Sequence, residues 1–101
     1  MNKSDEHAAA WPGEELVQTG LGDLAQGVMS DCSLLVLIAA PRLRRLGIQV
    51  PEVPWAKPYE HQLYGRLEER LGKGAHSYYN SLLRRIVSYS RALERNEASQ
   101  K

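Results

Sequence analysis

The stretch "SDCSLLVLIAAPRLRRLG", residues 30–47, decides the fold because it contains an apolar run without a polar side. Five large apolar residues occupy positions 34–38, and Ala39 and Ala40 come next. A helix that is apolar all round is usually buried at the centre of a domain. A short buried strand would give the same run, but the alanines and the Leu/Arg pattern after them favour a helix. We therefore expect a central helix here.

Two signals set the limits of this central helix. Ser30 or Asp31 can cap its start, because both side chains accept hydrogen bonds from the free N–H groups of a first turn. Pro41 lacks an N–H and its ring clashes with the preceding turn, so we expect the helix to break or kink there. A short new helix that starts at Pro41 and ends at Gly47 would satisfy both constraints.

The sequence before the central helix, residues 14–27, carries a helical pattern. Its apolar residues fall at i, i+4, i+7 and i+11, on one face of a helix: Val17, Leu21, Leu24 and Val28. Gly20 and Gly22 lie inside the pattern. They leave two alternatives, the close approach of a neighbouring helix or a local break. Residues 1–12 are polar and acidic, and we expect a flexible tail there.

The sequence after the central helix contains a connection and two further helices. Residues 47–58 hold three prolines and should be extended. This connection is either a packed tether between helices or an exposed ligand for an aromatic-lined groove. Helical patterns follow at residues 58–72 and from Ser77 onward, each bounded by a proline, glycine or serine signal.

The predicted fold class is all-α. We expect a small bundle of four main helices, one broken at Pro41, with a Pro-rich extended connection. Short links between helices imply mostly antiparallel neighbours. The predicted single helical domain covers residues 13–97, and we expect residues 98–101 to form a frayed C-terminus.

Composition restricts the class of protein. A chain of 101 residues suits one domain, and its single cysteine, Cys32, excludes an internal disulfide. Cys32 lacks a paired base, which favours a small buried side chain over a catalytic thiol. No secretion signal, membrane span, phosphate-binding loop or metal-ligand pattern occurs. We therefore expect a cytoplasmic protein without a cofactor, a metal or a membrane partner.

The charges are unevenly divided along the chain. Residues 1–41 contain one lysine and six acids, for a net charge of −5, whereas residues 42–101 contain twelve Lys or Arg and six acids, for +6. The acidic first half either docks on the basic second half or leaves a basic face for an acidic partner. We favour the first interpretation, because such asymmetry often arises by chance.

The stretch "SYYNSLLRRIVSYSRALER", residues 77–95, should form the last helix, with separate apolar and basic faces. At 100° per residue, the expected core face comprises Tyr79, Leu82, Ile86, Ser90 and Leu93, flanked by Leu83 and Val87. The opposite face carries three arginines at i, i+7 and i+11: Arg84, Arg91 and Arg95. Arg85 projects separately, near Tyr78 and Tyr89, where its guanidinium could stack on a ring.

The arginine stripe suits an anionic partner, since arginine offers fork-shaped donors to phosphate and carboxylate. It could follow a nucleic-acid backbone, bind an acidic protein, or only solvate the outer face. Apolar residues outside the helix stripes indicate an association surface: Trp11, Ile48, Val50, Val53 and Trp55. We predict a small helical protein–protein interaction or accessory module that binds a protein partner or self-associates as a homodimer. Nucleic-acid binding is the alternative.

The stretch "RLGKGAH", residues 70–76, places an Arg and a His at a helix junction. Arg70 and His76 resemble the Arg-x4–6-His motif of the HEPN ribonucleases, which are small helical-bundle proteins that often dimerise. The resemblance implies metal-independent RNA cleavage, with His76 as general acid or base and Arg70 stabilising charge on phosphate. Alternatively, Arg70 only closes one helix and His76 begins the next. We expect a binding protein rather than an enzyme.

Overall fold

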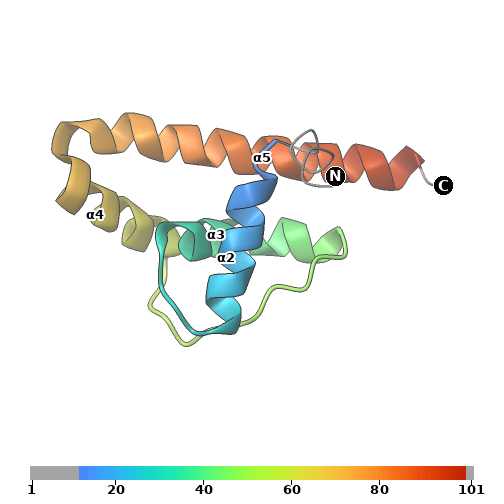
Figure 1. Cartoon of the computed structure of the whole chain (residues 1–101), viewed down its shortest axis with the longest axis horizontal. Coiled ribbons are helices and arrows are strands. Elements are labelled where there is room, and N and C mark those ends of the chain that lie inside the picture. Colours follow the sequence, from blue (N-terminus) through green and yellow to red (C-terminus); the bar gives the residue numbers. More distant parts are fainter. Residues whose placement is uncertain (1–11, 100–101) are drawn as a thin grey trace, which may run out of the picture.

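The chain is helical throughout its regular elements. The computed structural model describes residues 12–99, with side chains up to residue 96. The elements are α2 (Glu14–Ala25), α3 (Asp31–Arg45), α4 (Tyr59–Leu71), the short 3-10 helix η1 (Gly72–Gly74) and α5 (Ala75–Ser99) (Figure 1). No strand occurs in residues 12–99, so the predicted all-α class is confirmed. The predicted tail, apart from Pro12, and residues 100–101 of the predicted frayed end lie outside the described residues.

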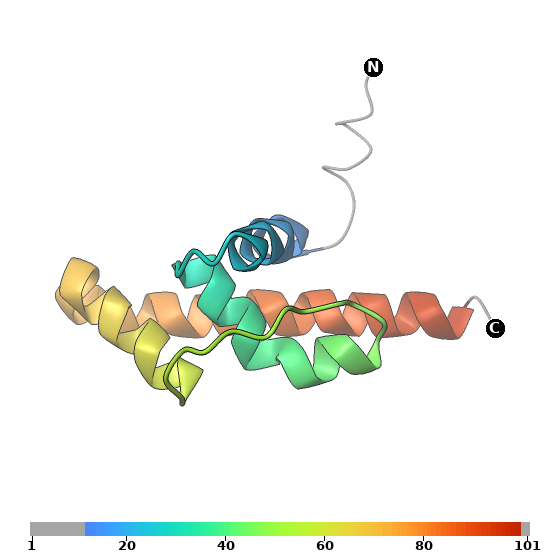
Figure 2. The same ribbon diagram turned by 90° about the horizontal axis from the view of Figure 1, so that it is seen from below.

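The helices pack around α3, which lies at the centre (Figure 1). α5 follows the long axis of the molecule and runs in the same direction as α3. α4 and α5 form an antiparallel hairpin, and α4 packs against α3. α2 crosses both α3 and α5 steeply and is seen almost end-on in Figure 2. Because α3 and α5 run in the same direction and α2 crosses both, the predicted bundle of four main, mostly antiparallel helices is not confirmed.

The side chains of α3 fill the core, as its apolar run predicts. Residues 33–37 are all buried, and Leu43 is fully buried near the other end of the helix. Ser30 caps α3: its Oγ accepts a hydrogen bond from the Ser33 N–H at 3.1 Å, and the Ser33 Oγ accepts one from the Ser30 N–H at 2.7 Å. This reciprocal arrangement satisfies two N–H groups that a helix start leaves free.

The predicted break at Pro41 is wrong, because α3 continues through Pro41 to Arg45. The proline removes the hydrogen bond to the Leu37 carbonyl, and a proline inside a helix costs about 3 kcal/mol. Leu37, Ala40 and Leu43 are nevertheless buried around it, while Pro41 itself is exposed. Burying each leucine contributes roughly 1.5–3 kcal/mol. Tertiary packing therefore outweighs the lost bond and keeps the helix continuous.

Gly20 explains how α2 can cross α3 so closely. A Cβ atom on Gly20 would lie 2.5 Å from both the Cys32 carbonyl oxygen and the Val36 Cγ2. Gly22 faces open space, with no atom within 4 Å of a Cβ placed there. Since α2 runs without interruption past both glycines, the close approach of a neighbouring helix, and not a local break, accounts for Gly20.

The Pro-rich connection is a packed tether. Residues 48–57 form no helix and cross the face of α3 (Figure 2). The Val50 side chain is buried, and Val53 and Trp55 pack partly buried against the core. The Arg44 guanidinium donates to the Val50 carbonyl from Nη2 at 2.8 Å and from Nε at 3.3 Å. The extended segment is thereby fixed to α3 and does not hang free as a ligand.

Ion pairs join the acidic first half of the chain to the basic second half. Asp31 pairs with both Arg66 and Arg70, at 3.2 and 2.8 Å, and Glu15 pairs with Arg85. These contacts support the interpretation that much of the charge asymmetry is used inside the fold.

Candidate functional site

The buried face of α5 determines which of its residues are available to a partner. Its buried side chains are Ala75, Leu82, Ile86, Tyr89, Ser90 and Leu93. The buried Ser90 hydroxyl is satisfied, since its Oγ donates to the Val87 carbonyl at 2.9 Å. The helix starts at Ala75, two residues before the predicted start at Ser77. Most of the predicted core face is therefore confirmed, with Tyr79 half-buried at its edge.

The buried face of α5 is rotated about the helix axis, relative to the predicted core face, towards Tyr89. Tyr89 is 3% exposed, whereas Val87, which we expected to flank the core, is 42% exposed. The start of α2 explains the difference. Gly13 lies so close to α5 that a Cβ there would be 2.5 Å from the Arg85 carbonyl oxygen and 3.4 Å from the Tyr89 Cβ. α2 therefore covers the Tyr89 edge, whereas on the other edge Leu83 is half-buried and Val87 is exposed.

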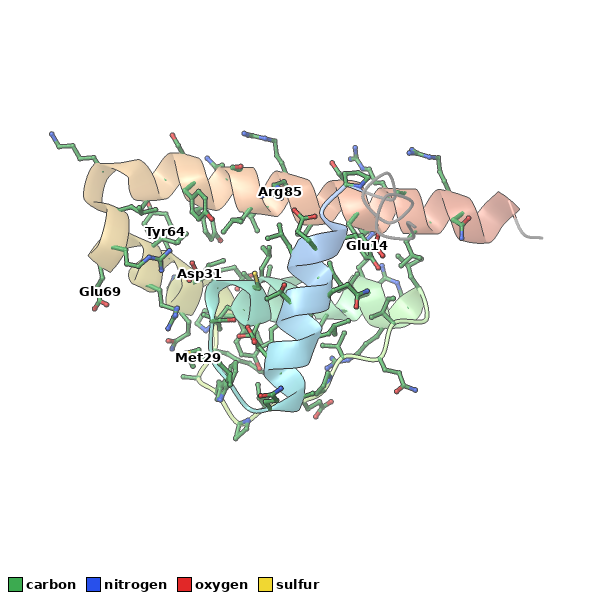
Figure 3. The ribbon with its side chains drawn as sticks, viewed as in Figure 1. Glu14, Met29, Asp31, Tyr64, Glu69 and Arg85 are labelled. Carbon is green, nitrogen blue, oxygen red and sulfur yellow. The ribbon has the colours of Figure 1, made fainter. Side chains whose placement is uncertain are left out.

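Arg85 belongs to the contact between α5 and α2. Its Nη2 donates to Oε2 of Glu15, in the first turn of α2. Figure 3 shows Arg85 on the side of α5 that meets α2, with Glu14 nearby. The sequence placed Arg85 beside Tyr78 and Tyr89 and gave no sign of this carboxylate 70 positions earlier in the chain.

An open groove lies along the outer side of α5. It has a volume of about 350 Å³ and is lined by Leu83, Arg84, Val87, Ser88 and Arg91. Leu83 and Val87 lie one helical turn apart, and Arg84 and Arg91 lie two turns apart on the adjacent row. We call this surface the α5 groove. It places an apolar strip beside a basic one on a single helix.

The two arginines of the α5 groove differ from the arginines that hold the fold together. Arg84 and Arg91 are exposed and make no ion pair or side-chain hydrogen bond within residues 12–96. By contrast, Arg42 donates from Nη2 to Oε1 of Glu94 at 2.8 Å, which binds the end of α3 to α5. Arg84 and Arg91 are therefore available to a carboxylate or phosphate from outside.

The other predicted binding residues, Arg95 and Trp55, do not line the α5 groove. Arg95 is exposed one turn beyond Arg91. Trp55 is half-buried against the core, on the extended segment. That segment and α5 lie on opposite sides of α3 (Figure 1). The four predicted binding residues therefore do not form one site.

Arg70, a predicted catalytic candidate, is held by Asp31. Arg70 Nη2 donates to Asp31 Oδ2 at 2.8 Å, and Arg66 Nε donates to Asp31 Oδ1 at 3.2 Å. Partial burial would raise the pKa of Asp31, but the hydrogen bonds and charges of the two arginines outweigh it and hold that pKa below its usual value. The ionised Asp31 thus links the start of α3 to α4.

His76, the second catalytic candidate, has different neighbours. Its Nε2 lies 3.2 Å from the Asn80 amide nitrogen, and its ring centroid is 6.4 Å from that of Tyr64. Figure 3 shows Tyr64 at the corner between α4 and α5. Within residues 12–96, no hydrogen bond joins His76 to Arg70. The ribonuclease interpretation gains no support from this arrangement and stays a prediction.

The described residues supply little for other kinds of site. Burial raises the pKa of the half-buried Cys32 thiol, with further contributions from nearby acids, so it is not an activated nucleophile. No group of three His, Cys, Asp or Glu side chains in this part of the chain could hold a metal ion. No helix there combines the length and the apolar character that crossing a membrane requires.

A second depression, of about 230 Å³, lies between α3, the extended segment and the start of α4. Its lining mixes Arg44 and Lys57 with Glu52, and Arg44 is already bonded to the Val50 carbonyl. Opposite charges at its edge give it no clear preference for an anion or a cation. The α5 groove is therefore the better candidate.

Comparison with known proteins gives no relative for this chain: no family model, curated protein or solved structure matches it.

The two apolar groove residues, Leu83 and Val87, were absent from the predicted binding set. The sequence does hold a signal for them. Leu83, Val87 and Arg91 follow one another at i, i+4 and i+8, so an apolar row passes directly into a basic one. Both residues are expected at the edge of the core; Leu83 does pack there, half-buried, whereas Val87 is exposed because α2 packs on the other side of α5.

Proposed function

We propose that this protein is a small helical protein-interaction module that binds its partner through the α5 groove. The supporting observation is that exposed Val87 and half-buried Leu83 lie beside Arg84 and Arg91, which have no partner in residues 12–96. Burial of the apolar strip would drive association. The arginines would add orientation and specificity.

A protein fits this groove better than a nucleic acid does. A nucleic-acid backbone is a dense line of phosphates, and proteins bind it with several cations. The α5 groove offers two arginines, and its remaining lining consists of Leu83, Val87 and Ser88. Arg95 extends the basic row but lies beyond the groove. Apolar side chains next to arginine are typical of the centres of protein interfaces.

Symmetric self-association through this groove is disfavoured by charge. In a twofold dimer the same patch meets itself. Arg84 and Arg91 of one copy would then approach the same arginines of the other copy, and the repulsion between these like charges opposes binding. A different protein is therefore the favoured partner. A homodimer through another surface is the second form of the proposal, and sedimentation equilibrium would detect it.

Photocrosslinking from the α5 groove tests the proposal. A photoreactive residue replaces Val87 in one variant and Glu68, which is exposed on α4, in a matched control. We expect a defined protein to crosslink at position 87, not at position 68, and to bind at least tenfold more weakly after Arg84→Glu and Arg91→Glu. Equal crosslinking at both positions would contradict the α5 groove as the binding surface.

Fluorescence anisotropy with labelled single- and double-stranded RNA and DNA separates the alternatives. We expect no nucleic-acid binding that depends on Arg84 and Arg91. Binding that falls steeply with salt and disappears in the double Glu variant would identify a phosphate-binding face instead. RNA cleavage abolished by His76→Ala would support the ribonuclease interpretation.

A further inference from the structure

We propose that the partner presents an acidic amphipathic helix, which lies along α5 and pairs two carboxylates, seven residues apart, with Arg84 and Arg91. This inference rests on the proposed function, because it names the kind of protein segment that the α5 groove accepts.

The spacing of the two arginines selects a helix over a strand. Arg84 and Arg91 are seven residues apart on α5, which is about 10.5 Å along the axis at a rise of 1.5 Å per residue. A partner helix offers side chains at i and i+7 with the same spacing and on the same face. In a strand the nearest equivalent, i and i+3, spans about 10 Å but points to opposite faces. On one face a strand offers spacings of about 7 or 13 Å, so it matches the two arginines less well than a helix does.

The apolar strip fits the same geometry. Leu83 and Val87 lie one turn apart, as do two apolar side chains at i and i+4 on a partner helix. Packed helices are 8–10 Å apart, and their side chains interdigitate in rows of this kind. The groove of about 350 Å³ is lined by five residues that all belong to α5, so neither α2 nor α4 forms a wall of it.

Charge complementarity identifies the partner as acidic. Glu94, the one acid of α5 within residues 75–96, is already bonded to Arg42 at 2.8 Å. Glu15 is likewise engaged by Arg85. Within residues 12–96, no carboxylate forms an ion pair with Arg84 or Arg91, so an incoming carboxylate does not have to displace one. Serine at position 88 lies between the arginines and adds a neutral donor.

Designed peptides test this inference on the full chain. The probe is a three-heptad helix with leucine at positions a and d and glutamate at e and g. A second peptide carries lysine at e and g, and a third has the glutamates moved to b and f, on the opposite face. Mutual repulsion of the glutamates keeps the first peptide from pairing with itself, and sedimentation checks this.

We expect the first peptide to bind at least tenfold more tightly than either of the others and to shift the backbone amide NMR signals of residues 83–91. Arg84→Glu with Arg91→Glu should reverse the preference, so that the lysine peptide now binds better. The matched control, Arg45→Glu with Lys73→Glu, changes the net charge equally at exposed positions away from the groove. It should alter affinity less than twofold.

Four results would overturn the inference. Equal binding of the three peptides would show that the spacing of the carboxylates does not matter. NMR shifts confined to α4 would show that the peptide does not bind in the α5 groove. Asp5→Lys with Glu6→Lys, tested without any peptide, checks a further occupant: shifts at residues 83–91 would show that the chain's own acidic N-terminal segment fills the groove. If a crosslinked partner depends on Arg84 and Arg91 while no acidic helix binds, the proposed function stands and this inference fails.

Discussion

Side chains have opposite roles at two places in the molecule: where α2 crosses α3, and in the α5 groove. At the crossing, Gly20 admits the backbone of α3, and the Ser30 hydroxyl caps α3 while donating to Asp23 Oδ2 at 2.6 Å. In the groove, Val87 is 42% exposed, and the two arginines have no partner in residues 12–96. Packing and polar groups are satisfied within the chain at one place and left open at the other.

This difference separates residues that hold the fold from residues that are free to bind. Substitutions at the crossing should change stability, whereas substitutions in the groove should change binding and leave stability nearly constant. Comparing the two regions by chemical unfolding is therefore a direct test of the assignment.

The largest expected effect is at Gly20. Gly20→Ala places a methyl group against the Cys32 carbonyl and Val36, where the available distance is 2.5 Å. We expect a loss of about 2–3 kcal/mol in the free energy of unfolding, as for overpacking of a core. The matched control, Gly22→Ala, meets no atom and should stabilise the protein by up to about 1 kcal/mol. Similar urea midpoints for the two variants would contradict the tight crossing.

Ser30 comes next. Ser30→Ala removes the cap of α3 and the bond to Asp23, and we expect a loss of about 1–2 kcal/mol. Ser88→Ala, in the exposed groove, serves as the control and should stay within about 0.5 kcal/mol of the native protein. Thermal and urea unfolding would measure both, and a larger effect at Ser88 would reverse the proposed contrast.

Asp31 gives a smaller, pH-dependent effect. Its pKa is lowered in the folded protein, so its stabilising contribution is fully present above its unfolded pKa of about 3.9 and is lost as pH falls through the folded pKa. We expect Asp31→Asn to cost about 1 kcal/mol at pH 7, through two partly exposed ion pairs and the helix dipole. The difference from the native protein should shrink below about pH 4. A constant difference from pH 7 to pH 3 would exclude this linkage.

The smallest effect on stability is expected in the α5 groove. Arg84→Ala and Arg91→Ala remove no hydrogen bond or ion pair within residues 12–96 and should each change the free energy of unfolding by less than about 0.5 kcal/mol. Arg85→Ala breaks the pair with Glu15 and should cost slightly more, up to about 1 kcal/mol. A loss above 1 kcal/mol at Arg84 or Arg91 would assign these arginines to the fold.

Local signals predicted the parts of the fold that depend on neighbouring residues. Ser30 caps α3, Gly72 ends α4 with a φ of +56°, and the prolines keep residues 48–57 extended. Pro41 is the counterexample. Its local preference to end a helix is overridden by the burial of Leu37 and Leu43 against other elements, which sequence periodicity cannot measure.

The candidate site was only partly predictable for a related reason. A helical wheel gives the apolar and basic rows of α5, and it correctly placed Arg84 and Arg91 on the outside. It does not give the edge against which a second helix packs, and the contact of Gly13 with α5 determines that Tyr89 is buried and Val87 exposed. The partner of Arg70, Asp31, lies 39 positions away and could not be inferred from a seven-residue motif.

The length of α5 has a consequence for how the molecule moves in solution. The molecule measures 42 × 27 × 24 Å, and its longest axis follows the 25 residues of α5 (Figure 1). Such a body rotates faster about its long axis than end over end. Adding a helix of about 10 Å diameter alongside α5 would widen it without lengthening it and make rotation more nearly isotropic. Nitrogen-15 relaxation, which measures this anisotropy, would therefore report occupation of the α5 groove.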